Sequence, residues 1–206
     1  MGDTAGGLPS VTPSSRSNWN FADVWEVVAD VHPERPAISQ GHRQITWREF
    51  DARADGVAAA LINVGLGRQA KVAQYLYNSP EYLESVFAAF KAGTVPVNTN
   101  YRYTEDELVY LWDNADVEAV VFHGSFAERA DRVRRRLPGV RAWFWVDDGE
   151  GDLPDWAIPY EEAAADRSSG AHVRADWGRT GDDLILIFTG GTTGMPKGVM
   201  WRQDDL

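Results

Sequence analysis

A glycine- and threonine-rich stretch near the end of the sequence combines residue types that bind phosphate groups. Its glycines let the backbone turn sharply and bring N–H groups close to an anion, and its threonine hydroxyls add donors at the same place. Lys197, just beyond it, supplies a mobile positive charge for phosphate oxygens. The stretch therefore predicts a polyphosphate-binding loop, formed by Thr189, Gly190, Gly191, Thr192, Thr193 and Gly194.

The spacing of this stretch differs from that of a Walker A loop, in which a glycine directly precedes the lysine and a helix follows. Here two residues separate Gly194 from Lys197, and Gly198 follows the lysine. Apolar runs at 184–188 and 199–201 predict a strand on either side of the loop. The sequence therefore argues against the nucleotide-binding loop of kinases and GTPases.

The elements that must position this loop follow from apolar periodicity, which begins near residue 19. Capping boxes at Thr46–Glu49 and Thr104–Glu107, and the pair Ser79-Pro80, mark three helix starts. Strands are predicted at 36–39, 71–77, 94–97, 117–122, 142–146, 184–188 and 199–201, and helices at 21–31, 47–64, 80–92, 105–112, 126–137 and 160–166.

Strands that alternate with helices of this length predict an α/β fold, a layered and mainly parallel sheet flanked by helices. In such a sheet ligands bind beyond the carboxyl ends of the strands, which is where the loop after strand 184–188 lies. We see no internal repeat. Residues 1–18 are rich in Gly, Ser, Thr and Pro and predict a disordered tail instead of a signal peptide. Residues 147–183 are acidic and predict a surface excursion before the next core strand.

The composition of the 206 residues excludes several classes of function. A formal net charge of −11 disfavours nucleic acid and anionic membranes as partners, and the sequence has no apolar run long enough for a transmembrane segment. There is no cysteine, so a disulfide framework, a thiolate metal site and a cysteine nucleophile are ruled out. Such a composition suits a cytoplasmic protein.

Three other groups of residues could form binding sites, but their sequence context favours structural roles. The basic run Arg132–Arg136 is either an anion-binding patch or a solvated helix face, and nearby acidic residues favour the second. Tyr101–Tyr103 either edges a ligand pocket or packs as a loop before a helix, and we favour packing. The histidines have no metal-ligand spacing and are taken as structural or solvent-facing: His32, His42, His123 and His172.

The glycine- and threonine-rich stretch closely resembles the phosphate loop of the adenylate-forming (acyl-CoA synthetase, AMP-binding) superfamily. The matches are Thr189, 191–194 and Pro196-Lys197-Gly198. Most members have Ser where this chain has Gly190; that residue and the following Met200-Trp-Arg202 resemble acyl-CoA ligases for fatty acids or steroid side-chain acids. Weaker matches upstream are residues 45–50, 78–82, 87–93 and 97–98.

The resemblance implies a two-step reaction, in which ATP with Mg²⁺ activates a carboxylic acid as its adenylate and CoA then accepts the acyl group. It implies that residues 189–194 wrap the β- and γ-phosphates, with Thr192 and Thr193 bonding phosphate oxygens. Lys197 would be the catalytic residue that neutralises charge on the leaving pyrophosphate. No residue of this chain is assigned to the metal.

The chain ends at Leu206, before the position of the superfamily's adenine-binding segment, ribose-binding aspartate, hinge and C-terminal catalytic lysine. We therefore expect residues 19–206 to be a truncated N-terminal AMP-binding domain that is inactive alone and binds ATP weakly or not at all. Two alternatives stay open: an adenylating enzyme that loads a carrier protein, and a non-catalytic binding or dimerising fragment. An open sheet edge after the last strand favours self-association, including a homodimer.

Overall fold

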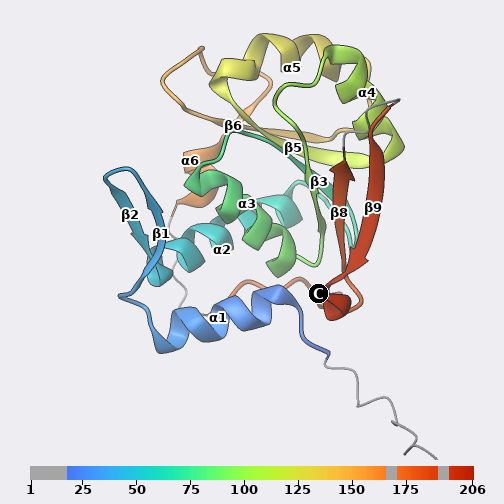
Figure 1. Ribbon diagram of the computed structural model, residues 1–206. Coiled ribbons are helices and arrows are strands. Elements are labelled where there is room, and N and C mark those ends of the chain that lie inside the picture. The colour runs from blue at the N-terminus through green and yellow to red at the C-terminus, as the bar shows by residue number, and fades with distance from the viewer. Residues whose placement is uncertain (1–17, 166–170, 190–194) are drawn as a thin grey trace, which may run out of the picture.

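The computed structural model describes residues 18–165, 171–189 and 195–206 (Figure 1). Seven strands form one sheet in the order β7-β6-β5-β3-β4-β8-β9. All neighbouring strands are parallel except β8 and β9, which are antiparallel. The strands are β3 (Lys71–Tyr75), β4 (Val95–Asn98), β5 (Val117–His123), β6 (Ala142–Val146), β7 (Ile158–Pro159), β8 (Leu184–Thr189) and β9 (Lys197–Arg202).

Helices cover both faces of this sheet, as Figure 1 shows. On one face, α4 (Glu105–Asn114) and α5 (Ala127–Arg134) pack with Tyr75, Val120 and Phe122 of the sheet. The opposite face carries α2 (Trp47–Asn63), α3 (Pro80–Lys91) and α6 (Tyr160–Ala164). The predicted layered α/β fold with a mainly parallel sheet is therefore confirmed.

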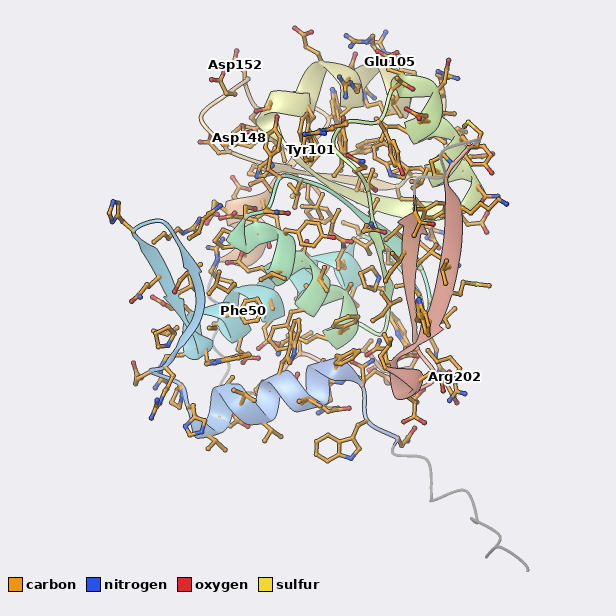
Figure 2. All side chains as sticks on the ribbon, viewed as in Figure 1. Phe50, Tyr101, Glu105, Asp148, Asp152 and Arg202 are labelled. Carbon is orange, nitrogen blue, oxygen red and sulfur yellow. The ribbon has the colours of Figure 1, made fainter. Side chains whose placement is uncertain are left out.

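Two further elements lie outside α2 and α3. Helix α1 (Phe21–Val31) and a hairpin of β1 (Pro36–Gln40) and β2 (Arg43–Thr46) form the start of the described chain. Phe50 on α2 lies between α1 and the layer above it (Figure 2). Its ring centroid is 5.7 Å from that of Trp25 on α1 and 5.0 Å from that of Phe87 on α3.

The helix starts expected from the sequence are present. Thr46 and Thr104 each accept a hydrogen bond from the backbone N–H three residues on, and both capping boxes are complete. Ser79 caps α3, with Pro80 in its first turn. These caps are local interactions, which explains why the sequence alone predicts them.

The helical spacing of Phe21, Val24, Trp25, Val28 and Val31 predicts that these residues form the apolar face of α1, and this prediction is wrong in part. Val24 and Val31 are exposed, whereas Glu26 is only 3% exposed. Periodicity fails here because Glu26 pairs with Lys91 and Arg179, and buried basic partners offset the cost of burying its carboxylate.

The prediction of a surface excursion at 147–183 is also wrong in part. Strand β7 extends the sheet edge, Tyr160 is buried beneath α2 and α3, and Arg179 and Asp183 are buried as well. Polar side chains anchor the later part of the segment, and their distant partners are not visible in the local pattern. The part of the predicted helix 160–166 beyond residue 165 lies outside the described residues.

Contact between α2 and α6 depends on Gly56. A Cβ at this position would lie 2.5 Å from the backbone oxygen of Ala163 and 3.1 Å from two backbone atoms of Ala164. The two helices approach this closely only because residue 56 has no side chain.

We therefore expect Gly56→Ala to lower the free energy of unfolding by about 1–3 kcal/mol, although alanine favours helix formation more than glycine does. Urea unfolding would measure the change. Gly67→Ala is the matched control, since a Cβ there meets no atom within 4 Å. A Gly56→Ala variant as stable as the unmodified chain would show that α6 does not pack against α2 as described.

Candidate functional site

The antiparallel pair β8–β9 positions the two described residues of the predicted polyphosphate loop. Thr189 is the last residue of β8, Lys197 is the first of β9, and they are register partners. Register partners in an antiparallel pair point to the same face of the sheet. The structure therefore places Thr189 beside Lys197. The loop residues between them lie outside the described residues: Gly190, Gly191, Thr192, Thr193 and Gly194.

Both side chains are exposed, and the Lys197 ammonium has no carboxylate within ion-pair distance among the described residues. Lys91, by contrast, is buried and forms ion pairs with Glu26, Asp51 and Asp55. Lys197 can therefore meet an incoming anion without first breaking an ion pair, which is what an electrostatic polyphosphate contact needs.

The residue just before this pair is fixed by two contacts. The Phe188 N–H donates a hydrogen bond of 2.7 Å to the side-chain Oδ1 of Asn98, the last residue of β4. The Phe188 ring is buried against Gly198, where an added Cβ would lie 2.9 Å from the ring. Sequence reasoning assigned no role to Asn98. A polar residue at the end of an apolar strand is a signal that the sequence contains. The sequence does not identify the hydrogen-bond partner of Asn98, because Phe188 lies 90 positions further along the chain.

The basic run Arg132–Arg136 is a solvated helix face, as the sequence favoured. Each of its four arginines pairs with a carboxylate, contributed by Glu105, Asp106 or Asp131. The loop Tyr101–Tyr103 is packed: Tyr103 is buried, and Arg129 donates hydrogen bonds to both of its tyrosine carbonyl oxygens. Carboxylates thus neutralise the four arginines of the first group. In the second group, Arg102 is exposed and its guanidinium lies over the Tyr101 ring, 5.5 Å from the ring centroid.

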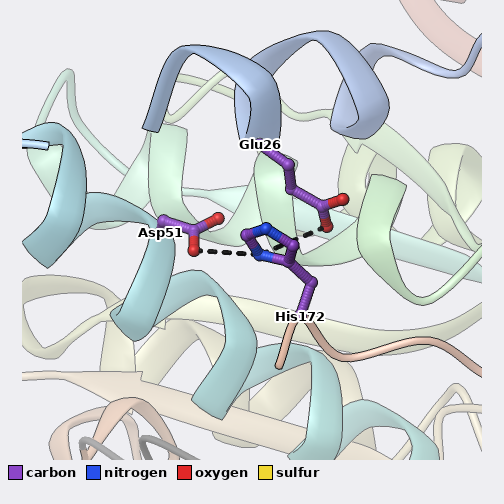
Figure 3. A group of neighbouring side chains, drawn as sticks. All are labelled: Glu26, Asp51 and His172. Carbon is purple, nitrogen blue, oxygen red and sulfur yellow. Dashed lines mark ion pairs between the residues drawn. The ribbon is translucent and has the colours of Figure 1, made fainter. Parts of the chain in front are cut away.

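His172, Glu26 and Asp51 come together in space and carry potential metal-ligand atoms (Figure 3). The His172 Nδ1 lies 3.2 Å from Asp51 Oδ2 and 4.0 Å from Glu26 Oε1. However, the buried Lys91 ammonium already lies 2.7 Å from Asp51, 2.8 Å from Asp55 and 3.0 Å from Glu26. A positive charge thus occupies the space among these carboxylates, and we interpret the group as an ion-pair network.

Arg179 extends this network to the segment that precedes β8. It forms ion pairs with Asp23 and Glu26 on α1. Burial alone would raise the pKa of both carboxyls, but hydrogen bonds and charge from Arg179, assisted at Glu26 by Lys91, outweigh it and hold each pKa below its ordinary value. Both groups therefore stabilise the folded chain in their ionised form.

The sequence was also compared with models of known protein families. A family model described as AMP-binding enzyme matches residues 25–206. The chain belongs to the AMP-binding enzyme family. The resemblance read from the loop is thus confirmed. None of the described helices is long and apolar enough to cross a membrane.

Among its relatives, the medium-chain acyl-CoA ligase Mig of Mycobacterium avium is 39% identical over 198 residues, a match that covers 89% of this chain and 35% of that protein. A 3-oxocholest-4-en-26-oate–CoA ligase of Rhodococcus rhodochrous is 36% identical over 188 residues, with coverage of 91% and 34%. The chain therefore spans about a third of the length of the curated relatives it matches.

Solved structures agree on the fold. The anthranilate CoA ligase AuaEII aligns with a TM-score of 0.79 at 22% identity, covering 91% of this chain and 35% of that one. A putative long-chain-fatty-acid CoA ligase from Rhodopseudomonas palustris aligns with a TM-score of 0.77 at 24% identity, covering 92% and 46%.

The ion-pair network predicts that Lys91→Met lowers the free energy of unfolding by about 3–5 kcal/mol, because Asp51 and Asp55 then lose their buried ammonium partner and Glu26 loses one of its two buried partners. Lys197→Met, at an exposed lysine, should change it by less than about 0.5 kcal/mol. Urea unfolding compares the two. A higher melting temperature of the unmodified chain on addition of Zn²⁺ would contradict the interpretation as ion pairs.

A second prediction concerns pH. Asp23 and Glu26 have folded pKa values below their ordinary values of 3.8 and 4.5, so their stabilisation is present above pH 4.5 and is lost as the pH falls through the folded values. Burial raises the pKa of Asp51 and Glu84 above their ordinary values of 3.8 and 4.5, so protonation of these two groups instead stabilises the fold as the pH falls through the raised values, and this gain is complete below 3.8.

We therefore expect the free energy of unfolding to decrease as the pH is lowered below 3.8, and to decrease less in Arg179→Met, which lacks the group that lowers both pKa values. Urea unfolding at a series of pH values measures this. An equal pH dependence in the variant would show that Arg179 does not set these titrations.

Proposed function

We propose that this chain is the N-terminal part of an AMP-forming acyl-CoA ligase, an acid–thiol ligase, and that it contributes the contacts to the polyphosphate of ATP. The observation that carries the proposal is the side-by-side placement of Thr189 and Lys197 at the carboxyl end of β8, where Lys197 has no ion-pair partner among the residues that the structure describes. Ligands of parallel α/β sheets bind at this end. Family membership supports ATP as the polyphosphate.

In the proposed reaction, a carboxylate oxygen of the acid attacks the α-phosphorus of ATP. The bond from that phosphorus to the β-phosphate oxygen breaks, and pyrophosphate leaves with the electron pair. The CoA thiol then attacks the acyl carbon, loses its proton, and displaces AMP to give the thioester. Mg²⁺ would enter with ATP, and we assign no residue of this chain to it.

The proposed role of Lys197 is to neutralise negative charge that grows on the leaving pyrophosphate. Thr189 would donate its hydroxyl to a phosphate oxygen on the same face. Gly190, Gly191, Thr192, Thr193 and Gly194 are proposed to complete this contact, on the strength of the resemblance alone. Preorganised donors of this kind accelerate a reaction because the developing charge meets fixed partners.

A medium- or long-chain fatty acid or a steroid side-chain acid is the substrate class that we propose, since these are the acids in the names of the relatives at 36–39% identity. The same names favour CoA as the acceptor over a carrier protein. ATP and CoA as substrates fit a cytoplasmic location. Self-association stays a proposal, supported by exposed Val199, Met200 and Trp201 on the edge strand β9.

In the full-length ligase we expect Lys197→Ala to lower kcat for adenylate formation by about 100- to 1000-fold, with the KM for the acid changed less than about twofold. Pyrophosphate release measures both constants. Lys71→Ala, at the start of β3 and so at the opposite end of the sheet, is the matched control. An equal loss in rate and in acid affinity would contradict the role assigned to Lys197.

A further inference from the structure

The end of β8 extends beyond its neighbour in the sheet. The last register pair between β4 and β8 joins Asn98 to Ile187, so Phe188 and Thr189 continue past the backbone of β4. On the other side, β9 is the edge strand of the sheet. The pair that carries Thr189 and Lys197 therefore depends on few backbone partners, and its free end would fray unless a side chain supports it.

Asn98 provides that support. Its Oδ1 accepts the Phe188 N–H at 2.7 Å, so the side chain continues the hydrogen bonding that the β4 backbone no longer supplies. The Asn98 side chain is half-buried and lines a cavity of about 450 Å³ with Gln74 and Ile187. Its position is therefore set by the sheet and partly sheltered from water, which favours a persistent hydrogen bond.

The side chain of Phe188 makes the second contact, which is to β9. The ring packs beneath Gly198, the register partner of Phe188 on β9. Thr189 and Lys197 are the next pair along the two strands. A shift of β8 by one residue would send the Thr189 side chain to the opposite face of the sheet, away from Lys197.

We propose that Asn98 is a positioning residue of the polyphosphate site. By accepting the hydrogen bond from the Phe188 N–H, it keeps Thr189 in register beside Lys197. The inference rests on the proposed function of these two residues. Asn98 itself need not touch the ligand. It acts through the backbone of β8, which links the centre of the parallel sheet to the site at its edge.

The test uses the 206-residue chain with inorganic pyrophosphate as the probe. Asn98→Ala removes the acceptor, and Asn98→Asp keeps an acceptor oxygen of the same shape. Asn100→Ala is the matched control, because Asn100 also accepts a backbone N–H, that of Arg102, but in the exposed loop after β4. The rate of amide hydrogen exchange at Phe188 measures how persistent its hydrogen bond to Asn98 is, and calorimetry measures the pyrophosphate affinity.

We expect Asn98→Ala to speed exchange at Phe188 and to weaken pyrophosphate binding, each by about tenfold, the factor that corresponds to one hydrogen bond. Asn98→Asp should retain slow exchange, and Asn100→Ala should match the unmodified chain in both measurements. A role in stability alone would lower the melting temperature of Asn98→Ala without changing pyrophosphate affinity below that temperature.

The outcomes separate this inference from the proposed function. If the unmodified chain binds pyrophosphate and Asn98→Ala binds it equally well, the inference is overturned and the proposed function stands. If Lys197→Met leaves pyrophosphate binding intact, the proposed role of Lys197 fails, and the inference fails with it. If the unmodified chain does not bind pyrophosphate, the rate of pyrophosphate release by the full-length ligase replaces the binding measurement, and an equal rate in its Asn98→Ala variant overturns the inference. In every case, equal exchange at Phe188 in Asn98→Ala and Asn100→Ala overturns the inference, because Asn98 then does not hold the Phe188 N–H.

Discussion

The register between β8 and β9 is the constraint on which the proposed site depends. Thr189 and Lys197 lie on the same face only while Phe188 stays opposite Gly198. Side-chain direction alternates along a strand, so even a one-residue slip would separate the hydroxyl from the ammonium. The parallel strands β3, β4 and β5 supply a rigid support on the inner side of β8, and the Asn98 side chain carries that support one step further than the β4 backbone reaches.

A second constraint acts on the segment that leads into β8. Residues 171–183 contain little apolar burial, and ion pairs and hydrogen bonds attach them to α1 and α2 instead. Arg179 binds Asp23 and Glu26, and the buried Asp183 accepts hydrogen bonds from the side chains of Asn20 and Gln69. A buried ionic network tolerates loss of a partner poorly, because the remaining charge stays desolvated. The entry to β8 is thereby tied to the first helix of the domain.

The sequence was sufficient for elements that local chemistry defines. Thr46, Ser79 and Thr104 mark helix starts through hydrogen bonds that span only a few residues, and the helices begin where these residues predict. The loop motif also predicted the family correctly. The order of the strands in the sheet, the burial of Glu26 in place of Val24, and the contact of Asn98 with Phe188 were not accessible. Each depends on partners far apart in the chain, whose proximity only the folded sheet creates.

We propose that polyphosphate binds at the β8–β9 pair in preference to any other basic surface of the described residues. Mapping amide chemical shifts of the ¹⁵N-labelled chain during a pyrophosphate titration tests it most directly. We expect the largest shifts among the described residues at Thr189 and Lys197. The paired arginines at 132–136 should change little. Shifts centred on 132–136, or no shift at Thr189 and Lys197 at saturating pyrophosphate, would contradict it.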